Sequence, residues 1–256
     1  MLAAKLLLMR TKLVRSTLQI FVSAVTLAGC SVLAQLPGGG AAGGMDALLR
    51  LFGDTKDFTA KVNVQVLDAS RQEVASFPMQ LTLLDKKQRV EMDLTQMKSK
   101  QMPAGMADTL KQMGMAQFVN IVRPDKKLAY SMYPTLKVVL TQPWSKASTE
   151  PKLERTEEGK ETIDGHPCVK YKNVLTDDAG KKTEATSWNA TDMKDFPVQI
   201  QAKDGENTSV LRFQQVQLTR PDEKLFEPPA DYTQYTNQAE LQQAVMAKFK
   251  EGAFKK

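Results

Sequence analysis

Apolar and polar residues alternate with a period of two through much of the first half of the chain. In 57–68 ("DFTAKVNVQVLD") every second residue from Phe58 to Val66 is apolar, and those between are mostly polar. The alternation returns in 77–84 ("FPMQLTLL") and 89–94 ("RVEMDL"). Three consecutive one-sided strands predict an antiparallel sheet with one covered face and one face in water.

The same pattern and its turn signals recur toward the C-terminus. Apolar residues alternate in 128–132 and again in 198–202, and the second run ends at Asp204-Gly205. An Asp-Gly pair after such a run is a strong hairpin signal. Residues 177–182 ("DDAGKK") predict another hairpin turn.

One strand breaks the alternation. In "VLRFQQVQL" Phe213 is in phase but Val216 is not, which predicts a β-bulge near Gln214 and Gln215. We expect about 11 strands in all, and a twisted sheet of roughly ten strands tends to curl. The predicted fold is therefore mainly β with a few helices (α+β): a curled antiparallel sheet that forms a half-open barrel with a helical lid.

Two segments have helical periodicity instead. In 103–113, Pro103 suits the first helical position and Gly114 suits the stop. In 237–251, Asn237 suits the N-cap. Each helix carries an apolar stripe, formed by Met106, Leu110 and Met113 in the first and by Leu241, Val245 and Phe249 in the second.

Residues 1–29 have the composition of a signal peptide. A basic stretch precedes an apolar run at 16–28, which is too short to span a bilayer. Either Met1 or Met9 serves as the start, since the stretch from Met9 is a sufficient basic region by itself. The signal predicts export to the envelope of a Gram-negative-type bacterium.

Two cleavage sites compete after this signal. Residues 27–30 ("LAGC") resemble a bacterial lipobox, in which Cys30 is acylated and becomes the N-terminus; 32–34 ("VLA") fit an ordinary secretion site after Ala34. We favour Cys30, which implies a membrane lipid partner at the periplasmic face of the outer membrane. Cleavage after Ala34 instead implies a soluble periplasmic or secreted protein. Residues 30–44 then form a flexible Gly-rich linker, 45–235 the folded domain, and 236–256 an amphipathic helix with a basic tail.

Charge and cysteine content narrow the functional classes. Four of the 35 basic residues lie in 1–29, which contains no acidic residue, so the net charge of +6 falls to +2 without this segment. With no basic patch among aromatic residues, we expect no nucleic-acid partner. If Cys30 is acylated or removed, Cys168 has no partner for an intrachain disulfide and is expected to be a small apolar residue.

Few residues of the chain are candidates for catalysis. His166 is the only histidine, and we interpret it as a turn or strand-start residue. Glu157, Glu158, Glu161 and Asp164 lie in 156–165 ("TEEGKETIDG"), which we interpret as a solvated turn region. No Gly-rich phosphate loop follows a strand. We therefore expect no cofactor, no metal and no enzymatic activity.

Several motifs follow one another in the second half: "GHPCVKY" at 165–171, Trp188, "DFPVQI" at 195–200 and "PDEKLFEPPADY" at 221–232. Behind an export signal and with a curled sheet, this order resembles a branch of the LolA/LolB-like lipoprotein carrier superfamily of the bacterial envelope, known mostly as domains of unknown function. The resemblance extends over about 46–232. It implies an apolar cavity for acyl chains between the concave face of the sheet and its helical lid.

Carried over to this chain, the cavity would be lined by apolar residues of the early strands and of the first helix: Val62, Val64, Met79, Leu81, Met92, Met106, Leu110 and Met113. Six of the 13 methionines fall between residues 92 and 115. Methionine side chains are flexible, so they suit a pocket that accepts varied acyl chains. They fill a closed core equally well. Methionine thioethers also bind copper, but this is the rarer use.

The principal hypothesis is a non-enzymatic envelope lipoprotein that binds a lipid or another apolar ligand. The alternative is a structural or regulatory module with a filled core, whose partner is an envelope protein. An envelope hydrolase is the third and least favoured reading.

Overall fold

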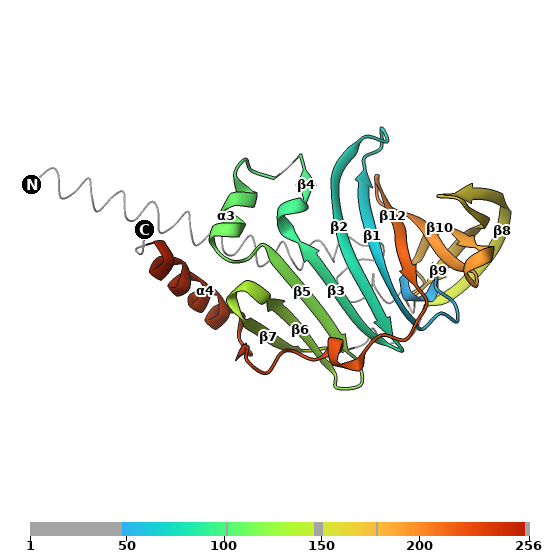
Figure 1. Ribbon diagram of the computed structural model, residues 1–256. Coiled ribbons are helices and arrows are strands. Elements are labelled where there is room, and N and C mark those ends of the chain that lie inside the picture. The colour runs from blue at the N-terminus through green and yellow to red at the C-terminus, as the bar shows by residue number, and fades with distance from the viewer. Residues whose placement is uncertain (1–47, 101, 146–150, 178, 254–256) are drawn as a thin grey trace, which may run out of the picture.

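The computed structural model describes residues 48–100, 102–145, 151–177 and 179–253. They form one large curled sheet with short helices at its margins (Figure 1). The predictions for the signal peptide, Cys30 and the linker lie outside the described residues. No helix of the described residues is long and apolar enough to cross a membrane.

The sheet consists of two successive antiparallel meanders and one late strand. The first meander contains β1 (Asp57–Leu67), β2 (Glu73–Leu84), β3 (Lys87–Asp93), β4 (Lys98–Ser99), β5 (Gln117–Arg123), β6 (Leu128–Tyr133) and β7 (Val138–Pro143). The second contains β8 (Lys152–Ile163), β9 (His166–Thr176), β10 (Lys182–Ala190), β11 (Phe196–Asp204) and β12 (Asn207–Gln217). The late strand is β13 (Thr233–Tyr235).

Pairing of β1 with β12 joins the two meanders side by side. The strand order is β13-β7-β6-β5-β3-β2-β1-β12-β11-β10-β9-β8, with β4 paired to β2. Because β13 and β8 stand at opposite ends of this order, the sheet curls without closing into a barrel. The predicted class, a mainly β fold with a curled, half-open sheet, is confirmed. The predicted number of about 11 strands is too low, because the described residues form a 13-stranded sheet.

The largest error concerns β8. The sequence predicts a solvated turn region over 156–165, but residues 156–163 belong to a 12-residue strand paired with β9, and only Asp164 and Gly165 form the turn. Charged residues lie on both faces of this edge strand, and most are exposed. The period-two signal is absent because neither face is buried. Charged edge strands of this kind resist pairing with other chains.

The inner face of the sheet is the face that carries the alternating apolar residues of β1. Phe58, Ala60, Val62 and Val64 are buried there, as the alternation predicts. Their neighbours in β2 and β3 continue the same layer, and all belong to one core cluster. Leu48, Leu51 and Phe52, which precede β1, pack into this cluster as well.

The outer face is not uniformly in water, which corrects the prediction of one wet face. On β5–β7 the outer side chains are buried beneath residues 218–232, named here the strap, which crosses them after β12 (Figure 1). A short turn of 3-10 helix in the strap, η4 (Glu223–Phe226), places Phe226 in this second core. The outer core comprises Leu84, Val119, Ile121, Tyr130, Met132, Val139 and Phe226.

Two helices match the predicted helical segments. The first, α3 (Met106–Gln112), begins three residues after the predicted start at Pro103, because Gly105 immediately before it adopts a left-handed conformation (φ 79°). It ends before Gly114, whose φ of 69° suits glycine and where a side chain would clash with Leu136.

The second helix, α4 (Gln238–Ala253), begins beyond Asn237, whose Oδ1 accepts a hydrogen bond from the backbone N–H of Ala239 (2.8 Å). This confirms the predicted N-cap. Leu241 and Val245 of the predicted stripe are buried, and Lys248 Nζ donates to the carbonyl of Leu136 (2.7 Å). The helix thus packs at the β7–β13 end of the sheet (Figure 1).

Candidate functional site

The eight residues predicted to line an apolar cavity lie together on the inner face. Strand register places Val62 opposite Met79, and Met79 opposite Met92, in one row across β1, β2 and β3. Phe213 of β12 and Phe118 of β5 extend this row at either end. Val64 and Leu81 occupy the adjoining rows of the same face. The sequence alternation alone thus brings five of the eight residues into one continuous surface.

The three residues from α3 complete the group. Leu110 and Met113 are buried in the same cluster as the sheet residues, and Met106 is partly buried against it. The α3 stripe therefore packs against the inner-face layer, close to the 3-10 turn η1 (Leu94–Gln96). Apart from Met106, every predicted lining residue is at most 4% exposed. These side chains are packed on one another, so a ligand at this position would have to separate them.

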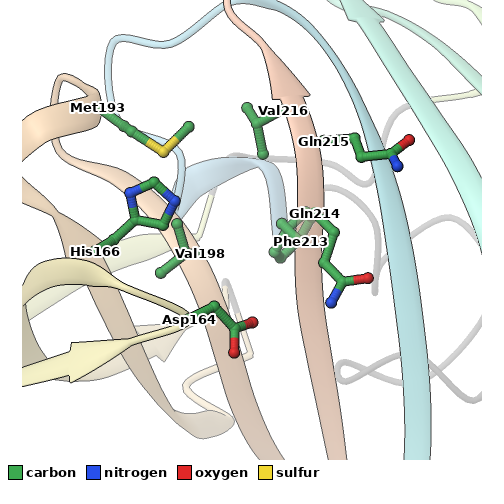
Figure 2. A pocket seen from close by; sticks show the side chains of 8 residues that line it. All are labelled: Asp164, His166, Met193, Val198, Phe213, Gln214, Gln215 and Val216. Atoms are coloured by element: carbon green, nitrogen blue, oxygen red, sulfur yellow. The ribbon is translucent and has the colours of Figure 1, made fainter.

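A pocket of about 390 Å³ lies elsewhere, at the margin of the second meander. We name it the rim pocket. It is lined by Asp164, His166, Met193, Val198, Phe213, Gln214, Gln215 and Val216 (Figure 2). None of these residues was predicted to bind a ligand. They come from the β8–β9 turn, from the start of β9, from the 3-10 turn η3 (Thr191–Met193), from the start of β11 and from the end of β12.

The β-bulge predicted in β12 shapes this pocket. Lys61 pairs with Gln214, whereas Thr59 pairs with Gln217, so β12 carries one extra residue at this point. Gln215 has a φ of 51°, the left-handed conformation typical of one class of bulge. The extra residue shifts the phase of the strand, so that Val216, two places after Gln214, lies in the pocket wall.

Aromatic packing fixes the floor of the rim pocket. The Phe213 ring contacts Phe52 and Phe196 edge-to-face, with ring centroids 5.4 and 5.7 Å apart and planes nearly perpendicular. Phe58 completes this group through Phe196, at 5.1 Å. Such edge-to-face pairs favour a fixed arrangement of rings. Phe213 thus presents a rigid apolar surface to the pocket.

Hydrogen bonds fix the opposite wall. Nδ1 of His166 lies 2.9 Å from Oδ2 of Asp192, and the Thr191 hydroxyl donates to the carbonyl of Pro167 (3.1 Å). Both contacts tie η3 to the start of β9, which holds Met193 at the pocket. As predicted, His166 is a strand-start residue, the first of β9.

The lone thiol near His166 is not arranged as a nucleophile. Cys168 is buried, and its Sγ donates to the backbone carbonyl of His166 (3.3 Å), not to the imidazole. Burial raises the pKa of the Cys168 thiol, which keeps it protonated. The described residues also contain no group of three His, Cys, Asp or Glu side chains that could hold a metal ion.

The "PDEKLFEPPADY" motif has a structural role in the strap. Arg123 is buried and donates to both carboxylate oxygens of Asp125 (2.9 and 2.7 Å), to the carbonyl of Phe226 (3.3 Å) and to Glu227. Lys137 pairs with Asp231 at 2.7 Å. These contacts fasten the strap over the outer core at its buried anchor, Phe226, and beyond it at Glu227 and Asp231.

The fold places these features in a definite class: an open, curled antiparallel sheet with an apolar inner face and helices at its margin. No protein-family profile and no curated protein sequence matches the chain.

Solved structures with a similar fold include a LolA superfamily protein from Nitrosomonas europaea (11% identity, 71% of this chain and 94% of that one, TM-score 0.41). Another is LprF from Mycobacterium bovis (12% identity, 74% and 95%, TM-score 0.38). A third is the MucA/MucB complex of Pseudomonas aeruginosa (9% identity, 75% and 63%, TM-score 0.37). The LolA superfamily is the group that the sequence motifs resemble.

The rim pocket shows what sequence reasoning missed. The Asp164-Gly165 pair, with φ values of 49° and 88°, forms a tight hairpin turn and is a signal that sequence rules could have used. The sequence indicates His166 as a turn or strand-start residue and Val198 as part of an alternating strand, and neither pattern indicates a pocket. That the β8–β9 turn meets the end of β12 depends on the curl of the sheet, which no local pattern encodes.

Proposed function

We propose that this protein is a non-enzymatic binding protein of the bacterial envelope that holds an apolar ligand, such as a lipid acyl chain, on the inner face of its sheet. The observation that carries the proposal is the unbroken apolar row from Phe213 through Val62, Met79 and Met92 to Phe118. Such a surface spans five neighbouring strands without a polar side chain.

Met92, Met106 and Met113 make this surface adaptable. Methionine side chains are unbranched and polarisable, and they repack around ligands of different shape. A chain that enters beneath α3 displaces these side chains and takes over their contacts. Burial of each methylene group contributes about 0.8 kcal/mol, so a long acyl chain offsets the cost of opening the layer.

Attachment to the membrane forms the second part of the proposal. Cys30 carries the acyl groups that hold the protein at the outer membrane, and residues 30–44 separate it from the folded domain. Two or more acyl chains anchor a protein stably, whereas one chain does so only marginally. A Cys30→Ser protein is expected to leave the membrane fraction; if it stays there, the acylation proposal is wrong.

The decisive variant for ligand binding is Met106→Glu. Met106 is partly buried on the α3 stripe, so a carboxylate there repels an acyl chain without entering the sheet layer. We expect lipid recovered by solvent extraction of the purified protein to fall at least about tenfold, which corresponds to roughly 1.4 kcal/mol. The exposed Gln112→Glu on the same helix adds the same charge and serves as the control. Unchanged lipid in Met106→Glu would contradict the proposal.

A filled core is the second candidate, and it has its own observation. Val62, Leu81 and Leu110 are almost fully buried by their protein neighbours. In this alternative the inner layer is only structural and the protein recognises another envelope protein through its surface. Wild-type protein that carries no lipid, while Met106→Glu is markedly less stable than Gln112→Glu, would favour it.

A further inference from the structure

We propose that the rim pocket is a separate binding site for a small amphiphile whose polar head donates hydrogen bonds, that is, an alkylammonium or an alkanol. Its volume of about 390 Å³ lies in the range of about 300–1,000 Å³ that small-molecule sites occupy. The site shares only Phe213 with the apolar row of the inner face, so the inference does not depend on inner-face binding.

The interior of the pocket accepts the hydrocarbon part. Val198 and Phe213 are buried and provide its deepest surface, and the bulge adds Val216 beside them. Met193 reaches the pocket from η3 on the side opposite Val216 (Figure 2). The aromatic neighbours of Phe213 hold this floor in place, so the cavity is preformed.

His166 provides the first hydrogen-bond acceptor. Its Nδ1 lies 2.9 Å from Oδ2 of Asp192, and an ionised carboxylate can only accept a hydrogen bond. When the ring is neutral, this contact places the proton on Nδ1 and leaves Nε2 as an acceptor. Because Asp192 holds the Nδ1 edge, the Nε2 edge turns toward the space between Met193 and Val198 (Figure 2).

Asp164 provides the second acceptor and sets the preference for charge. Its carboxylate lies in the pocket wall, and among the described residues no lysine or arginine lines the pocket. Arg212 lies outside the pocket lining, with its Nη1 3.8 Å from Oδ1 of Asp164, and its Nε and Nη2 donate to Oε1 of Gln199. An anionic head group would face Asp164 without a compensating cation in the pocket, whereas an ammonium or hydroxyl group finds two acceptors.

The sole histidine of the chain allows a direct test. His166 gives the only imidazole signals of the protein, and they report on this pocket alone. The full chain is titrated with octylammonium, octanol and octanoate at one pH while the His166 proton and nitrogen chemical shifts are recorded. We expect saturable shifts with octylammonium and octanol, and binding of octanoate at least about tenfold weaker than that of octylammonium.

An Asp164→Asn variant tests the head-group assignment. Asparagine tolerates the left-handed conformation of the turn as aspartate does, so the hairpin is retained. We expect the preference for octylammonium over octanoate to fall to about threefold or less. The control is Asp177→Asn, in the turn between β9 and β10. Asparagine keeps the side-chain oxygen that accepts a hydrogen bond from the backbone N–H of Lys181. The preference for octylammonium over octanoate should not change in this variant.

Three results would each overturn the inference: no shift of His166 with any of the three probes, octanoate binding as tightly as octylammonium, or an unchanged preference in Asp164→Asn. Loss of lipid from the inner face in Met106→Glu leaves the His166 titrations unaffected. Failure of the rim-pocket inference is therefore distinguishable from failure of the proposed function.

Discussion

The two meanders of the sheet use different means to stabilise a similar set of hairpins. The first, β1–β7, is held by apolar burial: its inner layer is continuous, and its outer face on β5–β7 is sealed by the strap and Phe226. The second, β8–β12, buries hydrogen-bonded polar side chains and ends in a charged edge strand and the rim pocket. The first meander thus has two apolar layers, whereas the second combines its part of the inner apolar layer with a row of buried polar side chains.

A polar row inside the second meander makes the contrast specific. Asn173, Ser187 and Asn189 are each only 1% exposed. The amide of Asn173 donates to the Ser187 hydroxyl (3.0 Å), which donates to Oδ1 of Asn189 (2.7 Å). The amide of Asn189 in turn donates to the carbonyl of Asp195 (2.7 Å), at the turn before β11. Buried polar groups that are fully paired in this way specify one arrangement of neighbouring strands.

The largest expected effect breaks the first meander at its outer core. Phe226→Ala removes a fully buried ring, and such changes typically cost about 3–5 kcal/mol. Urea denaturation should show this loss in the free energy of unfolding. The neighbouring Leu225 is exposed, so Leu225→Ala is the control and should change stability by about 0.5 kcal/mol or less. Equal effects of the two variants would mean that the strap is not anchored by Phe226.

The next effect tests the polar row. Ser187→Ala removes the link between Asn173 and Asn189 and leaves a buried amide oxygen without its donor, which costs about 1–3 kcal/mol. Thr186→Ala on the same strand, where the side chain is only half-buried, is the control and should cost less. If Ser187→Ala is as stable as the wild type in thermal unfolding, the second meander does not depend on its buried hydrogen bonds.

A smaller effect is expected at the bulge in β12. A β-branched residue is strongly disfavoured at positive φ, so Gln215→Val should destabilise the protein by about 1–2 kcal/mol, whereas Gln215→Gly should not. Gln217→Val, on the same strand but beyond the bulge, is the matched control. Comparable costs of valine at both positions would show that the left-handed conformation does not matter.

The smallest expected effect is a loss of stability at low pH. The hydrogen bonds from Arg123 lower the pKa of Asp125 to about 2. Burial opposes ionisation of Glu227, but hydrogen bonds from Lys126 and Arg123 outweigh it and lower the pKa of Glu227 as well. Because these pKa values are lowered in the folded state, their stabilising contribution is complete above the unfolded values of about 3.9 and 4.3. It is lost as the pH falls toward about 2.

Asp125→Asn provides the measurement for this effect. The free energy of unfolding of the wild type should exceed that of the variant above about pH 5, and the difference should shrink as the pH falls through the window of the shifted pKa. We expect a small difference throughout, since the Asp125 side chain is 47% exposed and solvent screens the pair. A difference that grows in acid would contradict the sign of the pKa shift.

The contrast between the meanders also explains how much of the molecule the sequence predicted. Alternation located β1, β2 and β3 and the buried residues Val62 and Met92, because one face of each strand is buried and the other is not. The bulge was predicted for the same reason, since Val216 falls out of phase. These features depend on local periodicity, which the sequence records directly.

The features that were missed depend on long-range contacts. Strand β8 has no buried face and therefore no periodic signal. The alternation at Tyr130 and Met132 was detected, but their partner Phe226 lies about a hundred positions further along the chain, so the second core was not anticipated. The rim pocket escaped because Asp164, Met193 and Val216 meet only when the sheet curls.

The most direct test of the central claim is native mass spectrometry of the exported protein, purified from the cell envelope. We expect additional mass that corresponds to a lipid or fatty acid and disappears on denaturation, with less of it in Met106→Glu than in Gln112→Glu. If the wild-type protein is fully folded and still shows only the bare protein mass, inner-face binding is contradicted. The apolar layer is then a filled core.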